Sequence, residues 1–142
     1  MVEEYGLIVN LKGMNVNELT QMPAILDYVE DLLGPSFFQW GGSFFIKFPH
    51  DEMVVPWHQD APYWNVTGRF ASSAWIAFDD INEENGAMSV VPGWHRKGTL
   101  PVRNSKFLEG FTQEIVPSAL PEDLEQQRVP YLMQAGQMAI HH

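Results

Sequence analysis

The sequence contains no cysteine among its 142 residues. This absence excludes a disulfide framework, zinc sites built from thiolates and cysteine nucleophiles, and it fits a reducing compartment. Basic residues are also few, with 8 lysines and arginines against 18 aspartates and glutamates, which gives a net charge of -10. Because such a charge repels phosphate backbones and anionic membrane surfaces, we expect no nucleic acid and no membrane as a partner.

Long apolar runs are missing as well, and the first residues lack the pattern of a signal peptide. The chain starts Met-Val-Glu-Glu-Tyr, without a basic start or an apolar run, and no stretch approaches the length that spans a bilayer. Hydrophobic residues make up 45% of the sequence, which is enough for one core at this length. We therefore expect a single domain over residues 1–142 and a cytoplasmic location.

One segment has the pattern of an amphipathic helix. From Pro23 to Leu33, apolar residues that include Ile25, Val29 and Leu32 recur at helical spacing. Proline suits the first turn of a helix, and Gly34-Pro35 is a stop signal. We expect this helix to pack against the outside of the domain through the three apolar residues.

The remaining segments favour short strands separated by turns. Aromatic and β-branched residues gather in four segments: Ser43 to Phe48, Ala71 to Phe78, Ala87 to Val91 and Gln137 to His141. Tyr5 to Leu11 fits a strand or a buried helical turn, and Thr99 to Tyr131, polar and rich in proline, fits a long insert between strands. The pattern predicts an all-β sandwich or jelly roll with an accessory helix.

The stretch Trp57-His58-Gln59-Asp60 carries the clearest chemical signal. In a strand, residues two apart point to the same face, so His58 and Asp60 would present an imidazole and a carboxylate together. Two histidines and one carboxylate form the facial triad that binds Fe(II) and leaves positions open for a co-substrate and O₂. On its own the His-x-Asp pattern is common. It more often forms a hydrogen-bonded pair at the surface or in the core than a metal site.

Further motifs precede and follow this stretch in the sequence: Ser43-Phe44-Phe45-Ile46-Lys47, Tyr63-Trp64, Ala74-Trp75-Ile76-Ala77, Glu84-Asn85-Gly86-Ala87-Met88 and Val91-Pro92-Gly93-Trp94-His95. Together with Trp57-His58-Gln59-Asp60, and in this order, they resemble the phytanoyl-CoA dioxygenase family of Fe(II)- and 2-oxoglutarate-dependent oxygenases. The resemblance extends upstream through residues 25–35 and downstream through Gly136-Gln137-Met138-Ala139-Ile140-His141-His142, so it covers nearly the whole chain.

The resemblance implies a fold, two cofactors and a set of site residues. The fold is a double-stranded β-helix, a cupin-like jelly roll, that holds Fe(II) and 2-oxoglutarate. His58 and Asp60 match the first two metal-ligand positions of the family. Gln59 and Trp75 match positions that line the 2-oxoglutarate pocket, where an amide and an indole donate hydrogen bonds to carboxylate oxygens. For both residues the structural alternative stays open: a solvent-facing amide for Gln59 and a core aromatic for Trp75.

Other aromatic and histidine residues have weaker claims to the site. Tyr63 and Trp64 follow the ligand segment and either wall the substrate side of the iron or serve as packing aromatics. His95 follows a Pro-Gly turn, and we expect it to bond backbone groups near the site rather than a metal ion. His50 lies in a loop, where a solvated side chain is expected.

The sequence departs from the family at its C-terminal end. Family members have a distal metal histidine a few residues beyond the position of His142, followed by an arginine that pairs with the far carboxylate of 2-oxoglutarate. The resemblance therefore implies a C-terminally incomplete domain, whose missing last strand leaves an edge that a second copy could cover. Two alternatives stay open: His141-His142 is the remnant of a tag, or one of the two is the distal ligand. Strand alternation lets only one of them face the iron.

The resulting functional hypothesis is an oxygenase that hydroxylates a small organic substrate with O₂ and converts 2-oxoglutarate to succinate and CO₂. Halogenation is a second hypothesis within the family, but it needs a small residue at the carboxylate position, where this chain has Asp60. A third hypothesis is a catalytically impaired metal- or ligand-binding β-helix domain. The sequence does not identify the organic substrate.

Overall fold

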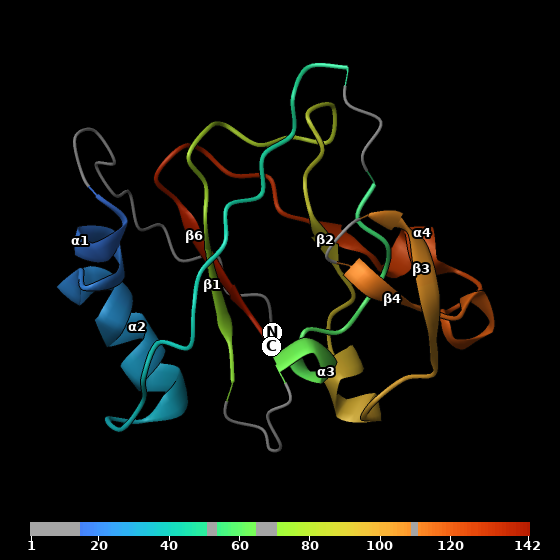
Figure 1. Cartoon of the computed structure of the whole chain (residues 1–142), viewed down its shortest axis with the longest axis horizontal. Coiled ribbons are helices and arrows are strands. Elements are labelled where there is room, and N and C mark those ends of the chain that lie inside the picture. Colours follow the sequence, from blue (N-terminus) through green and yellow to red (C-terminus); the bar gives the residue numbers. More distant parts are fainter. Residues whose placement is uncertain (1–14, 51–53, 65–70, 109–110) are drawn as a thin grey trace.

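The computed structural model describes residues 15–50, 54–64, 71–108 and 111–142, and Figure 1 shows their arrangement. In the described residues, short strands alternate with helices and helical turns. In chain order the elements are α1 (Val16–Thr20), α2 (Pro23–Leu33), α3 (Ala61–Trp64), β1 (Ser73–Ile76), β2 (Ser89–Val90), the 3-10 helix η1 (Trp94–Lys97), β3 (Val102–Leu108), β4 (Phe111–Ile115), the 3-10 helix η2 (Pro117–Ala119), α4 (Leu124–Gln127), β5 (Val129–Pro130) and β6 (Met138–His141).

The strands pair as three antiparallel two-stranded sheets, β1 with β6, β2 with β5, and β3 with β4. The first two sheets belong to one interrupted ribbon. An isolated bridge between Ile81 and Met133 continues the register that pairs Ser73 with His141. A turn at residues 83–86 then interrupts the ladder before Ser89 pairs with Pro130. This ribbon brings the two ends of the described β segments, near residues 73 and 141, side by side.

The β1–β6 pair separates two hydrophobic clusters, because successive side chains of a strand point to opposite faces. On the helix side, Met138 is 1% exposed and packs with Leu19 and Ile25. On the other side, Ala77 and Ala139 pack with Tyr131 and further residues. Figure 1 shows α2 on one side of the pair, and α3 with the β3–β4 hairpin on the other. One face of the pair therefore serves the core with α2, and the opposite face is available for the site.

The expected helix is confirmed from Pro23 to Leu33. Proline occupies the first turn, and Gly34 ends the helix at φ 83°, a conformation that glycine adopts at little cost. Ile25 is buried and Val29 packs against the same cluster, as the spacing predicts. Leu32 was expected on this face but is 52% exposed, because the contacts of the helix with β1 and β6 do not reach its last turn.

The expected strand from Ser43 to Phe48 is wrong. This segment forms no strand ladder in the described structure, and Phe44, Ile46 and Phe48 are exposed. Strand propensity reflects how a side chain fits a pleated, half-buried surface, so aromatic residues without a neighbouring strand do not form one. The expected strands around residues 71–78, 87–91 and 137–141 are confirmed at their centres, as β1, β2 and β6.

The polar segment from Thr99 to Tyr131 is not the irregular insert that its composition suggests. It contains the β3–β4 hairpin, two helical turns and β5. The fold is β-rich with accessory helices, as expected, while closure into a double-stranded β-helix remains a prediction. The expected element at Tyr5 to Leu11 lies outside the described residues. No described helix has both the length and the apolar character needed to cross a membrane.

Met138 is the most deeply buried residue of the cluster that α2 shares with the β1–β6 pair. We expect Met138→Ala to lower the free energy of unfolding by about 2–5 kcal/mol, because the substitution leaves a cavity in a closed cluster. Leu132→Ala is the matched control, since Leu132 is 52% exposed and its truncation should cost about 0.5 kcal/mol or less. Urea denaturation measures both values, and equal losses for the two variants would contradict this description of the core.

Candidate metal centre

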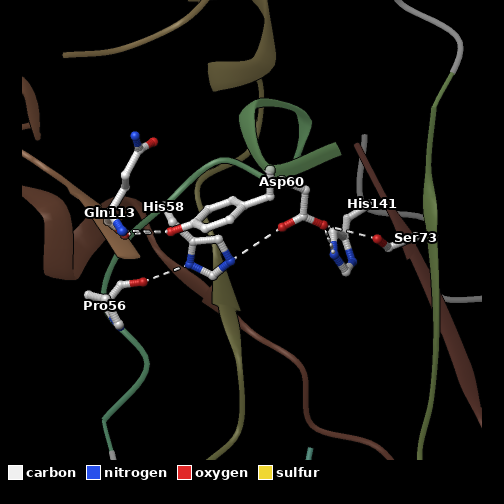
Figure 2. A network of polar contacts seen from close by, with 7 residues as sticks. Pro56, His58, Asp60, Ser73, Gln113 and His141 are labelled. Atoms are coloured by element: carbon white, nitrogen blue, oxygen red, sulfur yellow. Dashed lines mark hydrogen bonds and ion pairs between the residues drawn. The ribbon is translucent and has the colours of Figure 1, made fainter. Parts of the chain in front are cut away.

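His58 and Asp60 lie close together, on the segment that leads into α3. Nε2 of His58 is 3.2 Å from Oδ1 of Asp60, and each side chain is about one-fifth exposed. Figure 2 shows the Asp60 carboxylate between two imidazoles, those of His58 and His141. Nε2 of His141 is 3.4 Å from the other carboxylate oxygen, Oδ2. The two predicted ligands therefore converge, and a second histidine approaches from the far side of the carboxylate.

The tautomer of His58 suits metal binding. Its Nδ1 lies 2.7 Å from the carbonyl oxygen of Pro56, and a carbonyl only accepts, so Nδ1 carries the proton. In the neutral ring Nε2 then keeps its lone pair, and this lone pair faces a carboxylate oxygen. Two acceptors at this distance need a cation between them, either a proton or a metal ion. A fixed Nδ1–H bonded to a carbonyl is the usual support of a metal-bound histidine.

The charges at this pair follow from the same contacts. Burial raises the pKa of Asp60, but hydrogen bonds from His141, His58 and Ser73 outweigh burial and hold this pKa well below its usual range. Burial lowers the pKa of His58, but the bonds to Asp60 and to the Pro56 carbonyl outweigh burial and leave this pKa raised. The carboxylate is therefore ionised at neutral pH and attracts a cation to the space beside it.

The structure distinguishes between the two C-terminal histidines. His141 is the direct cross-strand partner of Ser73, and both side chains project toward Asp60. His142 instead lies with its ring 5.8 Å from the ring of His95. Strand alternation requires that only one of the pair faces the site, and the register assigns that place to His141.

The β3–β4 hairpin holds the ligand segment in place. The backbone N–H of Ile115 donates to the carbonyl of Trp57 at 2.8 Å. The Tyr63 hydroxyl donates to the carbonyl of Gln113 at 2.6 Å and accepts from the N–H of the same residue at 3.1 Å. The Tyr63 ring meets the His58 ring edge-on, with centroids 5.9 Å apart. Tyr63 therefore positions the ligand segment, and a substrate-facing role for Tyr63 or Trp64 remains a prediction.

Gln59, the residue between the two ligands, is engaged with backbone groups. Its amide nitrogen donates to the carbonyl of Gly98 at 3.0 Å, and its amide oxygen accepts from the N–H of Leu100 at 2.8 Å. Both ends of the amide thus tie the ligand segment to the chain that enters β3. A role in binding 2-oxoglutarate remains a prediction, and it would use the second N–H of the amide, beside the one bonded to Gly98.

We expect Gln59→Ala to lower the free energy of unfolding by about 1–3 kcal/mol, since two hydrogen bonds worth about 0.5–1.5 kcal/mol each are lost. Gln39→Ala is the control, because the Gln39 amide makes one long, exposed bond to Gly41. Chemical denaturation gives the stability of both variants. Unchanged stability of Gln59→Ala, together with weaker 2-oxoglutarate binding, would instead favour the co-substrate role.

Two further aromatic residues lie near the carboxylate. Trp75 is on the same face of β1 as Ser73, and its ring centroid is 5.7 Å from that of Tyr131. Burial and the Asp60 charge raise the pKa of Tyr131 to about 12, so its hydroxyl stays protonated. Trp75 packs with the inner hydrophobic cluster, as a core aromatic does, and its contact with 2-oxoglutarate remains a prediction. Sequence patterns alone did not single out Ser73 or Tyr131, although Ser73 lies two residues from Trp75 on one strand face.

Two donor atoms at this site, one from His58 and one from Asp60, are spaced to bind the same divalent cation. Ligands at right angles on one metal ion lie about 3 Å apart when each bond is about 2.1 Å long, and Nε2 of His58 and Oδ1 of Asp60 match this spacing. In the part of the chain that the structure describes, no group of three or more histidine, cysteine, aspartate or glutamate side chains is arranged to hold a metal ion. His141 is close, but it meets the opposite oxygen of Asp60.

Comparison with known proteins places this β-rich chain among relatives that are named as dioxygenases. The family model of phytanoyl-CoA dioxygenase (PhyH) matches residues 9–142. The chain belongs to the phytanoyl-CoA dioxygenase family.

Three curated relatives are similar to this chain over part of their length. The chain is 31% identical to L-proline trans-4-hydroxylase of Streptomyces griseoviridis, over 56% of this chain and 31% of the relative. It is 30% identical to the peroxisomal phytanoyl-CoA dioxygenase of Mus musculus, over 85% of this chain and 37% of the relative. It is 27% identical to a probable alpha-ketoglutarate-dependent hypophosphite dioxygenase of Stutzerimonas stutzeri, over 89% of this chain and 44% of the relative. The chain thus spans less than half the length of each relative. No solved structure matches it significantly.

Proposed function

We propose that this chain carries the metal-binding part of an Fe(II)- and 2-oxoglutarate-dependent oxygenase that hydroxylates a small organic substrate. Family membership supports the general kind of reaction. The observation that carries the proposal is the pairing of His58 and Asp60. The Nδ1 proton of His58 is bonded to a carbonyl, and its other ring nitrogen points at an ionised carboxylate, at the spacing of two ligands on one metal ion.

In this proposal His58 and Asp60 bind Fe(II), and the described residues around them keep both donors in position. Pro56 holds the imidazole tautomer, while Tyr63, bonded to β4, packs against the ring. Bound at this site, Fe(II) with 2-oxoglutarate would supply O₂ activation, with succinate and CO₂ as by-products of hydroxylation. The aromatic Trp75 lies on the site face of β1, where it can contact the co-substrate. Two protein donors hold a metal ion less firmly than three, so we expect weak binding.

The experiment is a titration of the 142-residue chain with Fe(II) and then 2-oxoglutarate under anaerobic conditions. The proposal predicts a visible charge-transfer band that needs both additions and is lost in Asp60→Asn. Admission of air to a sample without organic substrate should then give a slow, iron-dependent release of succinate. The matched control is Asp79→Asn, which removes an exposed carboxylate away from the site.

Two outcomes would count against the proposal. Metal binding without a 2-oxoglutarate-dependent band or succinate would favour the alternative function, a metal- or ligand-binding domain without oxygenase activity. The observation that favours this alternative is that the Gln59 amide, expected to bind 2-oxoglutarate, already bonds two backbone groups. Binding that is equal in Asp60→Asn and in the unmodified chain would place the metal elsewhere and contradict the site itself.

A further inference from the structure

The two oxygens of Asp60 have different surroundings. Oδ2 lies 2.9 Å from the Ser73 hydroxyl, which donates to it, and 3.4 Å from Nε2 of His141. Oδ1 faces only one of the residues drawn in Figure 2, His58. Since Ser73 and His141 are direct cross-strand partners, the ladder of β1 and β6 fixes both groups on the same side of the carboxylate.

The two histidines beside Asp60 also differ in their other ring nitrogen. Nδ1 of His58 has the Pro56 carbonyl as its partner, so Nε2 is the ring nitrogen that faces Oδ1 of Asp60, at 3.2 Å. Nδ1 of His141 is buried and has no hydrogen-bond partner among the described residues. If His141 bound a metal through Nε2, its proton would move to Nδ1 and leave a buried N–H without an acceptor there. With the proton on Nε2, the same ring can donate to Oδ2, which lies 3.4 Å away.

We infer that His141 is a positioning residue rather than the second histidine ligand: with Ser73 it donates to Oδ2 of Asp60 and so turns Oδ1 toward the metal ion shared with His58. Partners of this kind orient a ligating carboxylate and hold its charge, and their loss typically weakens metal binding by about 10–100-fold. Tyr131 supports the arrangement, since its ring lies 5.9 Å from the His141 ring. The inference rests on the proposed metal site and adds the reason for the orientation of its carboxylate.

The test compares two substitutions at one position. Glutamine can place an amide N–H near the former Nε2 but is a poor ligand for first-row metals, whereas leucine offers neither a donor nor a ligand. Co(II), which does not react with O₂ under these conditions, is the probe. Its affinity is measured by isothermal titration, and its visible absorption bands report the ligand set. We expect His141→Leu to weaken Co(II) binding by about 10–100-fold. His141→Gln should retain most of the affinity with unchanged absorption bands.

Two controls accompany this comparison. His142→Leu removes the adjacent histidine, whose ring lies beside His95, and should leave Co(II) affinity unchanged. Ser73→Ala removes the second donor to Oδ2 and should weaken binding in the same direction as His141→Leu. Thermal unfolding of each variant shows whether the fold is retained, and His141→Gln keeps the test valid if His141→Leu fails to fold.

Three results would overturn the inference. Equal losses in His141→Gln and His141→Leu, with shifted Co(II) bands, would make His141 a ligand. Unchanged Co(II) affinity in His141→Leu, together with lost affinity in Asp60→Asn, would support the metal site but contradict the positioning role of His141. Absence of Co(II) binding to the unmodified chain would overturn the inference and the proposed function together.

Discussion

Asp60→Asn should reduce Co(II) affinity by more than about 100-fold, beyond the loss expected for any supporting residue. The substitution keeps the shape of the side chain but removes the negative charge that both imidazoles and the Ser73 hydroxyl surround. A neutral amide is a weak ligand, and its NH₂ group would either face the donors Ser73 and His141 or take the place of Oδ1 beside His58. Titration calorimetry against Asp79→Asn, an exposed aspartate, measures the effect. Affinity within a few-fold of the unmodified chain would mean that the carboxylate does not bind the metal.

His58→Ala should cause a loss of similar size, because it removes the one imidazole whose tautomer is fixed for coordination. The His58 side chain is 21% exposed, so the space left by the ring is open enough for a small molecule to enter. We expect added imidazole to restore part of the Co(II) binding in this variant. His50→Ala is the matched control, since His50 lies exposed in a turn. No loss in His58→Ala, or the same imidazole response in the control, would contradict the assignment.

Local sequence signals predicted the helix well, because its determinants lie within the helix itself. Pro23 at the first turn, Gly34 after the last, and Ile25 and Val29 on one face are all visible without knowledge of the fold. The predicted burial of Leu32 is wrong, because its burial depends on how far the neighbouring strands extend. The strand expected at residues 43–48 failed for a related reason. Its residues are typical of strands, but no described strand pairs with them.

The β3–β4 hairpin shows what composition could not reveal. Its sequence is polar, and the cross-strand pair of Arg103 with Glu114, whose side chains are joined at 2.6 Å, replaces the apolar contacts that usually mark a strand. The hairpin also matters for the site, because Ile115 and Gln113 form hydrogen bonds with the segment that carries His58. The site is therefore supported by a part of the chain that sequence patterns alone placed outside it.

For the candidate site, the sequence identified the pair but not its environment. The spacing of His58 and Asp60 and the family resemblance were sufficient to name both residues, and the structure brings them within 3.2 Å. The choice between His141 and His142 required the register of β1 with β6, a long-range pairing that alternation alone cannot supply. The bonds of the Gln59 amide to Gly98 and Leu100 likewise depend on a turn that is distant in sequence.

The most direct test of the metal centre is anomalous diffraction from crystals of this chain grown with Mn(II), collected at a wavelength where manganese scatters strongly. The prediction is one peak about 2.0–2.3 Å from Nε2 of His58 and Oδ1 of Asp60, with His141 still bonded to Oδ2. A peak bound by His141 in place of His58, or no peak beside Asp60 at saturating Mn(II), would contradict the site proposed for this chain.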